Sequence, residues 1–358
     1  MYKLYCNLHF LIKFTLIVLL CFASTGCQES PVLVKSGADH FQPIIERVEQ
    51  GKASNIHSLL AWQNGQLLLE LYRQGGGLDG NYQTSRLPIG PDELHNIHSV
   101  TKSFVATLIF IAIDEGKISS LEAQIFDFFP EYKGGDRKQK EKIRLRDVLN
   151  MSTGYALDEL SVPYSDGVAN VFSRHYHAKD VYQQFVETEV AFEPGTRFSY
   201  SGLSTIGLSK VIERAYGKPF TQVMKEKLFE PLSITNYQWL AHFGSGEAGA
   251  DWGLRLTSRD MGKFGLMWLD GGVYGGRQIV AKHWLGQLKT SRFSGYKMGY
   301  GLHFWQVPSA DAVMAVGYGE QYIAIIPSKK AVVVTTAGNY KLTFQPVLGL
   351  IQQLVGEL

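Results

Sequence analysis

The chain has 358 residues, of which 45% are hydrophobic and 12% aromatic, enough to bury one large core or two interleaved subdomains. Its formal net charge is +2. Without residues 1–26, which hold two lysines and no acidic residue, the 35 basic side chains fall to 33, equal to the 33 acidic ones. This balance excludes a global field that would attract nucleic acid. One basic run, residues 137–144, is interpreted as a solvated loop leading into a helix, although it could touch a membrane.

Residues 1–26 have the layout of a secretory signal. Lys3 and Lys13 accompany an apolar run at residues 14–23, which is too short to span a bilayer as a mature helix. The Ser-Thr-Gly sequence before Cys27 is similar to a bacterial lipoprotein processing site. We therefore expect Cys27 to become the lipid-modified first residue of an exported, periplasmic protein held at the membrane. Ordinary signal cleavage is the alternative.

All three cysteines of the chain lie in this first segment, at Cys6, Cys21 and Cys27. The mature protein is thus expected to have no disulfide, although it would be exported to an oxidising compartment.

The first elements after the signal are short. Residues 27–40 are predicted to form a tether, and residues 41–51 an amphipathic helix. Residues 58–72 are predicted to form two strands about Asn64-Gly65, a dipeptide typical of tight β-hairpins. A hairpin is therefore expected near the start of the folded domain.

The rest of the chain changes from helices back to strands. The expected elements are a mainly helical insertion at 126–240, a helix at 260–270, strands at 322–327 and 331–336, and a closing helix at 346–358. Strands at both ends with helices between them predict one antiparallel sheet built from both ends of the chain. We expect an α/β (α+β) fold over residues 41–358, with the sheet flanked by helices and joined to a mainly helical subdomain.

A possible nucleophile lies in residues 94–116, at the start of a nearly all-apolar run typical of a buried helix. Ser99 and Lys102 are three residues apart and would share one face of that helix. Unpaired backbone N–H groups and the helix dipole at this end favour developing negative charge. The spacing predicts an acyl-transfer nucleophile. Its alternative is a helix-capping serine followed by a surface lysine.

Two further segments carry candidate chemistry. Residues 193–202 contain a Pro-Gly turn that delivers Tyr200 just before a helix. Residues 315–321 form a glycine-rich entry to the strand at 322–327, and glycine at such a place indicates close backbone approach to a ligand or to another strand.

Together these segments resemble the serine β-lactamase and penicillin-recognising superfamily, on the side that holds class C β-lactamases, D-alanyl-D-alanine carboxypeptidases, family VIII esterases and 6-aminohexanoate-dimer hydrolase. The matching blocks run in family order across roughly residues 53–340. They are His98-Ser99-Val100-Thr101-Lys102-Ser103, Leu149-Asn150-Met151-Ser152-Thr153-Gly154, Glu193-Pro194-Gly195 through Tyr200-Ser201, Leu256-Thr257-Ser258-Arg259-Asp260, and Gly317-Tyr318-Gly319.

The resemblance implies a serine hydrolase in which Ser99 Oγ attacks a carbonyl and forms an acyl-enzyme. Either Lys102, if burial lowers its pKa, or Tyr200, if Lys102 stabilises its phenolate, could be the base. We expect the pair to act as one coupled base, with Tyr200 protonating the leaving group. The oxyanion is expected between the backbone N–H groups of Ser99 and Tyr318. The expected substrate-binding residues are Ser201, Gly317 and Gly319.

The chain departs from the family pattern at three positions. Gly202 replaces an asparagine, Ala315 begins the block where lactamases have Lys-Thr-Gly, and Glu320 replaces a frequent glycine. The cation that grips a β-lactam carboxylate is therefore missing at Ala315. Uncharged esters are the expected substrates, unless Arg197 or Arg292 supplies the charge from elsewhere.

Other readings of the sequence are weaker. His95 with His98, and His175 with His177, could be metal pairs, but neither has a third ligand at a recognisable spacing, so no metal or cofactor is expected. No Gly-x-Ser-x-Gly elbow of an α/β-hydrolase is present. Two alternatives remain open: a peptidase or amidase acting on peptidoglycan-derived peptides, and a catalytically silent binding protein of the same fold.

Overall fold

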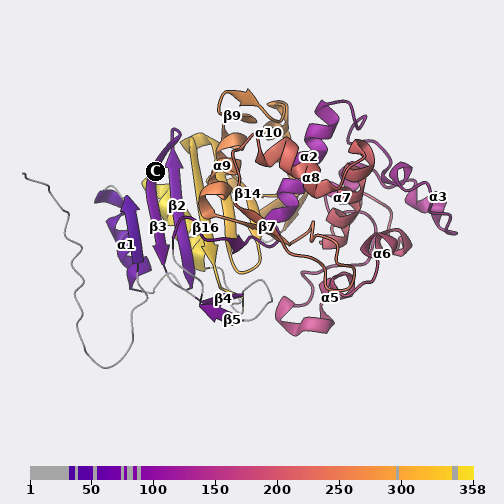
Figure 1. The fold of residues 1–358 in the computed structure, drawn as a ribbon, viewed down its shortest axis with the longest axis horizontal. Helices are drawn as coiled ribbons and strands as arrows, with labels where there is room; N and C mark the ends of the chain where they lie inside the picture. Colours follow the sequence, from indigo (N-terminus) through magenta and orange to yellow (C-terminus); the bar gives the residue numbers. More distant parts are fainter. Residues whose placement is uncertain are drawn as a thin grey trace, which may run out of the picture. The chain divides into compact units, whose positions relative to one another are not determined.

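The computed structural model describes residues 32–36, 39–50, 55–73, 76–78, 84–86, 90–295, 298–340 and 346–358 (Figure 1). The expected signal segment, with Cys27 and its lipidation, lies outside these ranges. Within them, no helix combines the length and the apolar character needed to cross a membrane.

A nine-stranded sheet is the main element of the fold, and every neighbouring pair of strands in it is antiparallel. In spatial order its strands are β1 (Val32–Ser36), β3 (Gln66–Arg73), β2 (Ile56–Gln63), β16 (Ala331–Ala337), β15 (Gln321–Ile326), β14 (Ala312–Gly317), β13 (Phe304–Val307), β12 (Met298–Gly301) and β11 (Phe293–Gly295). In Figure 1, indigo strands from the start of the chain lie beside yellow strands from its end. The expected sheet built from both ends of the chain is confirmed.

The two predicted hairpins set the register of the sheet. Between β2 and β3, Asn64 and Gly65 both have positive φ, 50° and 78°, which is the conformation that a tight Asn-Gly turn requires. Between β15 and β16, the turn Pro327–Lys329 ends at Lys330 in the left-handed region. The long pairing of β2 with β16 then joins these hairpins into one surface.

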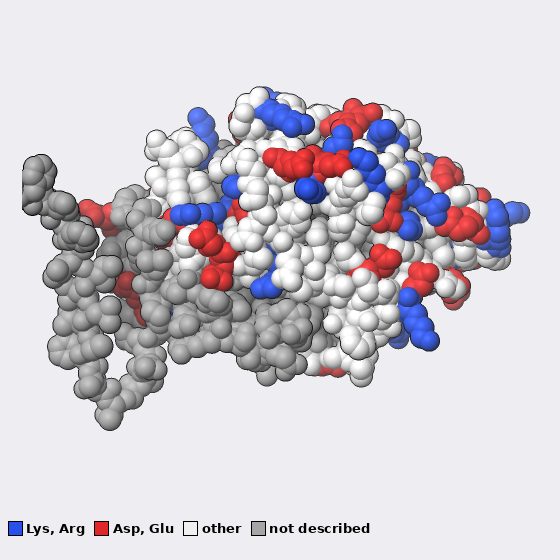
Figure 2. Space-filling view, viewed as in Figure 1, with Lys and Arg blue, Asp and Glu red and all other residues white. Residues whose placement is uncertain are grey.

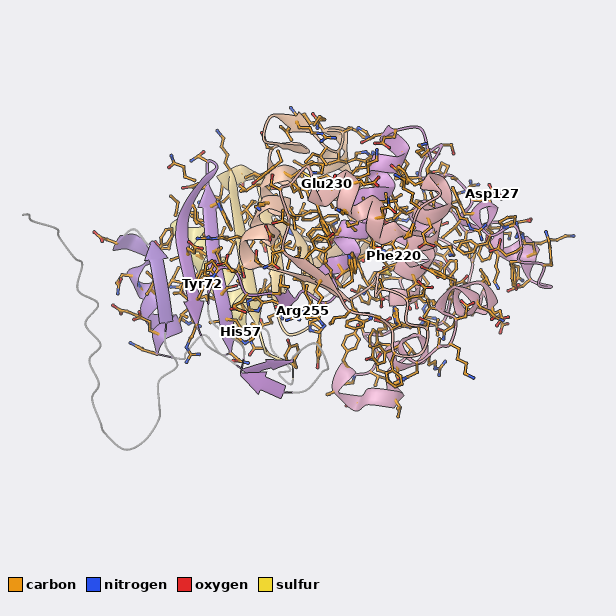
Figure 3. The ribbon with its side chains drawn as sticks, viewed as in Figure 1. His57, Tyr72, Asp127, Phe220, Glu230 and Arg255 are labelled. Carbon is orange, nitrogen blue, oxygen red and sulfur yellow. The ribbon has the colours of Figure 1, made fainter. Side chains whose placement is uncertain are left out.

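Both faces of the sheet are covered by helices. Along β16 the side chains alternate, so that Val333 packs with helices α1 (Gln42–Glu49) and α11 (Pro346–Glu357), while Val332 and Val334 face the larger core on the other side. That larger core includes α9 (Ser258–Leu269). Figure 3 shows the side chains that fill the space between the sheet and the helices, and it labels Tyr72 on β3. A strand buried on both faces tends to be apolar along its length, and β16 is buried at every position and apolar from Ala331 to Val334.

Helix α2 (Val100–Asp114) runs through the larger core and is buried along almost its whole length. It packs against α7 (Gly202–Tyr216), which ends at Gly217 in the left-handed conformation. Other helices of the predicted insertion surround them: α4 (Leu145–Leu149), α6 (Val181–Glu187) and α8 (Phe220–Met224). The strand just before α2 in the chain is β6 (His95–Asn96). It belongs to a small sheet with β8 (Leu254–Leu256) and β7 (Tyr237–Trp239).

Three local predictions differ from the structure. Val32–Ser36, inside the predicted tether, pairs with β3 as strand β1. The strands β11, β12 and β13 were not predicted, because their glycines and polar residues hide the alternating pattern. Ala315 to Gly317, read as an entry to a strand, is itself the end of β14.

The basic run is also not a solvated loop. Arg137–Lys140 forms the short helix α3, and the Lys140 side chain is fully buried. Its ammonium lies 2.8 Å from the carboxylate of Asp136 and donates to the Tyr132 hydroxyl at 3.0 Å, which offsets the loss of hydration. Elsewhere on the visible face, lysines and arginines are interspersed with acidic residues (Figure 2).

Candidate active site

Ser99 lies at the N-cap of α2, directly after a tight turn. His98 has a positive φ of 47°, and its N–H donates to the side chain of Asn96 at 3.0 Å. The backbone N–H of Ile97 donates to Leu254 in β8 at 3.1 Å. These bonds fix the entry to the helix, and with it the position of the Ser99 hydroxyl.

Lys102 is buried beside that hydroxyl rather than exposed at the surface. Its ammonium donates to Ser99 Oγ at 3.0 Å and to the main-chain carbonyl of Asp251 at 2.7 Å, and only 2% of the residue is exposed. The surface-lysine alternative is therefore wrong. A buried ammonium that is hydrogen-bonded to a serine hydroxyl is the arrangement a Ser-Lys nucleophile requires.

Tyr200 joins this pair from the start of α7. The ammonium of Lys102 lies 5.2 Å from the centre of its ring, and Lys102 and Ser99 both act to lower the pKa of its hydroxyl. The carbonyl of Tyr200 accepts from the N–H of Glu159 at 2.8 Å, while Ser201 caps α7 through the N–H of Leu203. The three residues predicted to carry the chemistry thus meet at one point.

The electrostatics of this trio favour protons on both Lys102 and Tyr200. Burial lowers the pKa of Lys102, but Tyr200, Asp251 and Glu159 raise it by more, so its pKa lies above the ordinary value. Burial also raises the pKa of Tyr200, although Lys102 and Ser99 act against that. A lysine deprotonated by burial alone does not fit these surroundings. The two groups are coupled, and neither titrates independently.

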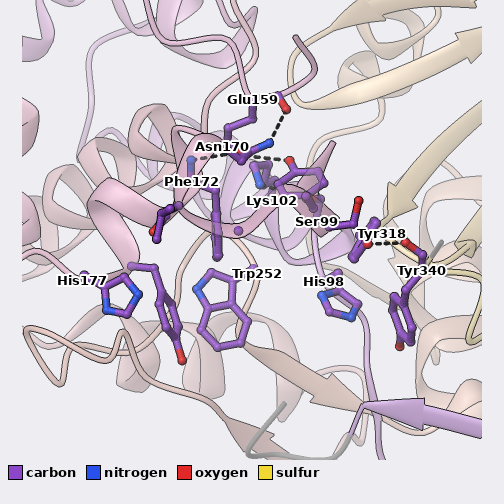
Figure 4. Close-up of a pocket in the computed structure, with 16 residues that line it drawn as sticks. His98, Ser99, Lys102, Glu159, Asn170, Phe172, His177, Trp252, Tyr318 and Tyr340 are labelled. Carbon is purple, nitrogen blue, oxygen red and sulfur yellow. Dashed lines mark hydrogen bonds between the residues drawn. The ribbon is translucent and has the colours of Figure 1, made fainter. Parts of the chain in front are cut away.

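A cavity of about 410 Å³ opens onto Ser99 and Lys102. Aromatic rings form much of its wall (Figure 4): Tyr164, Phe172, Tyr176, Trp252, Tyr318 and Tyr340. Among the described lining residues, Lys102 is the single lysine or arginine and Glu159 the single carboxylate. The volume suits a small organic ligand, and the wall offers mainly apolar contact.

Tyr318 is held at the edge of this cavity by its surroundings. It follows the last residue of β14, its hydroxyl donates to the main-chain carbonyl of Tyr340, and its ring meets His98 edge-on at 5.7 Å between centres. Two residues later, Glu320 adopts a φ of 71° and accepts from the N–H groups of Val347 at 2.9 Å and Leu348 at 3.4 Å. Glu320 therefore fastens the glycine-rich turn to the first turn of α11, a favourable place for a carboxylate.

The three expected substrate-binding residues are outside the described lining of the cavity. Ser201 is occupied as the cap of α7. A Cβ at Gly317 would lie 2.3 Å from the carbonyl of Ile97, and one at Gly319 would lie 2.4 Å from the ring of Tyr340. These glycines permit close packing of the protein on itself.

The suspected substitutes for a missing cation are also elsewhere. Arg197 lies over the ring of Phe192, and Arg292 donates to the carbonyl of Gly195 at 3.2 Å. Neither is among the described residues of the cavity wall. Tyr155 is also outside the described cavity wall, since it is buried and donates to the carbonyl of Phe185 at 3.0 Å.

The predicted histidine pairs separate in the structure. His95 stacks on His57, whereas His98 faces the cavity. His175 is buried, whereas His177 is exposed at the cavity. No group of three histidine, cysteine or acidic residues within the described ranges is arranged to hold a metal ion.

Sequence reasoning missed a set of buried charges behind Lys102. Glu159, His175, His242 and Asp251 lie within ion-pair distance of one another in a chain of contacts. They come from separate segments, and nothing in the local sequence distinguishes them from surface residues. The one available signal was Gly202, whose missing side chain leaves room for the carboxylate of Asp251.

Comparison with known proteins agrees with this fold. The family model for β-lactamases matches residues 46–347, and the chain belongs to the β-lactamase family, whose members are serine hydrolases. It is 25% identical over 235 residues to a 6-aminohexanoate-dimer hydrolase of Paenarthrobacter ureafaciens, covering 64% of this chain and 55% of that protein. The chain spans about half the length of the curated relatives it matches.

Solved structures share the fold at low sequence identity. A family VIII carboxylesterase superimposes with a TM-score of 0.68 at 17% identity, covering 92% of this chain and all of that one. The D-alanine carboxypeptidase AmpC of Burkholderia cenocepacia gives 0.65 at 16% identity, with 89% and 98% covered. These likenesses establish the architecture alone.

Proposed function

We propose that the protein cleaves an ester or amide bond through an acyl-enzyme on Ser99. The observation that carries this proposal is the 3.0 Å hydrogen bond from the buried ammonium of Lys102 to Ser99 Oγ, at the mouth of a cavity. A hydroxyl held by a coupled Lys-Tyr pair is an activated nucleophile.

In the proposed reaction, the Lys102–Tyr200 pair first loses one proton to solvent. Ser99 Oγ then attacks the substrate carbonyl as its own proton passes to the base that this leaves on the pair. Backbone N–H groups of Ser99 and Tyr318 would stabilise the oxyanion, and one such donor is typically worth about 10² to 10³ in rate. Tyr200 then protonates the leaving group as the tetrahedral intermediate collapses. Water attacks the acyl-enzyme in the second half of the reaction, and the same pair takes the proton from the water.

The proposed substrate is a small, uncharged ester with an apolar acyl or aryl group. The aromatic wall favours apolar contact, and Lys102 already donates to Ser99 and Asp251. The described lining therefore offers no unengaged lysine or arginine to a carboxylate. The name of one structural neighbour, a family VIII carboxylesterase, is consistent with this preference.

Labelling with a fluorophosphonate probe tests the nucleophile. We expect the wild type to be labelled and Ser99→Ala to lose all labelling while keeping its melting temperature. Ser161→Ala is the matched control, because Ser161 is an exposed serine whose hydroxyl bonds only locally, and it should label like the wild type. A folded wild type without labelling would favour a silent binding protein.

A substrate screen tests the reaction class. p-Nitrophenyl acetate and butyrate should be hydrolysed by the wild type, with turnover abolished in Ser99→Ala. Hydrolysis of D-amino-acid peptides in preference to these esters would move the assignment to a peptidase or amidase.

A further inference from the structure

Four ionisable side chains form a buried chain of contacts behind the catalytic trio. His242 Nε2 lies 3.1 Å from one carboxylate oxygen of Asp251, and His175 Nε2 lies 3.5 Å from the other. His175 Nε2 also lies 3.4 Å from Glu159 Oε1. Each of the four residues is at most 2% exposed. Charges this deeply buried are costly unless they are paired, so their grouping requires an explanation.

The two carboxylates of this cluster have different surroundings. Glu159 is well supplied with donors, since it accepts from the Tyr164 hydroxyl at 2.8 Å and from the N–H of Gly202 at 2.5 Å. The Asp251 carboxylate has ion-pair contacts with the two imidazoles, which are not aligned as hydrogen bonds. Burial raises the pKa of Asp251, but His242, His175 and Lys102 outweigh burial and hold it below the ordinary value. The surroundings of Asp251 therefore favour its negative charge although the residue is fully buried.

Asp251 reaches the catalytic trio in two ways. Its main-chain carbonyl accepts from the ammonium of Lys102 at 2.7 Å, and its negative charge, with that of Glu159, favours the cationic form of Lys102. The two imidazoles contact the two oxygens of the Asp251 carboxylate and favour its ionised form.

The position of Asp251 depends on a glycine in the tyrosine block. A Cβ at position 202 would lie 2.1 Å from Asp251 Oδ2 and 2.9 Å from its Cγ, distances at which the carboxylate would have to move. Gly202, the residue that replaces the asparagine of the family pattern, therefore creates the space that Asp251 fills.

We propose that Asp251, clamped between His242 and His175 in the space left by Gly202, is a positioning residue that holds Lys102 as a cation against Ser99 and Tyr200. This inference rests on the proposed function. In the resulting site, Lys102 acts as a fixed positive charge that favours the Tyr200 phenolate, and the phenolate then takes the proton from Ser99 Oγ. The cluster does not touch the substrate.

The ionisable groups around Lys102 come from several elements. Asp251 and Glu159 favour its cationic form, as does Tyr200. On the other side, burial and the charge of Lys102 lower the pKa of His98 and of His303 to about 3. These histidines are neutral at working pH, so Asp251 and Glu159 supply the negative charge that sets the titration of Lys102.

The first test is Asp251→Asn, which keeps the size of the side chain and removes its charge. Turnover of p-nitrophenyl butyrate should be followed from pH 5 to about pH 11.5 and corrected for spontaneous hydrolysis, because the pKa of Lys102 lies above its ordinary value. We expect kcat to fall about 10-fold or more, with KM changed less than about threefold. Loss of a negative charge lowers the pKa of Lys102, so the limb of the pH profile due to Lys102 should move to lower pH by about one unit. A purely structural role would not move this limb.

The second test distinguishes the effect of the space that Gly202 leaves from the effect of the charge on Asp251. Gly202→Ala should displace the carboxylate and reproduce the loss of kcat. The double variant Gly202→Ala/Asp251→Gly should recover the wild-type melting temperature. The Lys102 limb of its pH profile should stay at the same lower pH as in Asp251→Asn. Gly207→Ala is the matched control on the same helix. Its Cβ would lie 2.6 Å from the ring of Phe185, so it should lower the melting temperature without moving the limb.

The outcomes distinguish this inference from the proposed function. If the wild type is labelled by the fluorophosphonate but folded Asp251→Asn keeps the wild-type kcat and pH profile, the positioning role is overturned and the function stands. If the wild type is not labelled at all, both fail. Loss of wild-type activity on chelation, with recovery on adding Zn²⁺, would also overturn the inference by assigning the cluster to a metal.

Discussion

Two parts of the cavity wall differ in how they use charge. Behind Ser99 the wall is backed by Lys102, Asp251 and Glu159, all buried and paired. Away from Ser99 the wall consists largely of aromatic rings, including Phe172 and Trp252, which carry no formal charge. In Figure 4, Glu159 and Lys102 lie in the upper part of the view, with Trp252 below them.

This difference separates chemistry from recognition. Fixed charges in a water-poor region act strongly on developing charge in a transition state, whereas aromatic faces contribute buried area to bound substrate and product alike. Substitutions behind Ser99 should therefore change kcat, and substitutions among the rings should change KM.

The largest expected effect concerns Lys102 and Tyr200. If the two act as one unit with Ser99, Lys102→Ala and Tyr200→Phe should each lower kcat/KM by about 10³-fold or more, and the double variant should cost little more than the worse single one. Single-turnover rates with p-nitrophenyl butyrate measure this. Penalties that multiply would show independent roles and contradict a single coupled base.

The next effect concerns charge on the substrate. Losing the two contacts that Ala315 and Gly202 cannot make corresponds to about 2 to 4 kcal/mol, or about 30- to 1000-fold in kcat/KM. We expect nitrocefin to be hydrolysed that much more slowly than p-nitrophenyl acetate or butyrate. Nitrocefin turnover that exceeds ester turnover would refute the preference for uncharged esters.

A lysine introduced among the uncharged residues should reduce the difference in kcat/KM between nitrocefin and the esters. Val168 lines the cavity and is 86% exposed, so Val168→Lys can place an ammonium at the mouth without burying it. Because exposed ion pairs contribute at most about 1 kcal/mol, we expect at most about a fivefold gain in kcat/KM for nitrocefin. The same variant should keep kcat/KM for p-nitrophenyl butyrate within about twofold of the wild-type value. A gain for nitrocefin that persists in 1 M salt would contradict an electrostatic origin.

A comparable effect on KM is expected from the aromatic wall. Trp252→Ala should raise KM for p-nitrophenyl butyrate about 10-fold while kcat stays within about threefold, because the ring contributes area to both ground and transition states. Trp239→Ala is the matched control, since Trp239 packs on Phe220 away from the described cavity wall. A fall in kcat with unchanged KM in Trp252→Ala would contradict the prediction that the aromatic part of the wall acts on KM.

The smallest effect concerns stability and pH. Burial lowers the pKa of His303 to about 3, so this histidine stays neutral when folded and gains a proton on unfolding below about pH 6.5. The unfolded state then binds more protons, and stability falls as pH drops from about 6.5 towards 3, by up to about 1.4 kcal/mol per pH unit for each such group. Urea unfolding at pH 7 and pH 5 should show a smaller loss for His303→Gln than for the wild type. An equal loss would mean that other groups dominate.

Much of this architecture could be predicted from local sequence. Asn64-Gly65 indicated a hairpin because few residues tolerate two positive φ values in succession. The spacing of Ser99 and Lys102 before an apolar run indicated the buried helix start, because both features are set within a few residues.

The contacts that complete the site could not be predicted, because they join segments far apart in the chain. Asp251 and Glu159 look like ordinary surface residues until the fold buries them beside His175. Lys140 was misjudged for the same reason, since its buried ammonium also donates to the carbonyl of Val186, which is far away in the sequence. The glycines 317 and 319 were correctly seen as sites of close approach, but the approaching atoms belong to the protein.

The link from Glu320 to the first turn of α11 has a consequence for biosynthesis. A ribosome makes Ser99 and Lys102 early, but the turn that bears Tyr318 is tied down only when residues 347 and 348 are available to bind Glu320. The strands of the first hairpin also wait for β16 as their neighbour. A chain without α11 would therefore keep Ser99 and Lys102 but lack the two N–H groups that fasten the turn of Tyr318, so the proposed oxyanion site would be completed last.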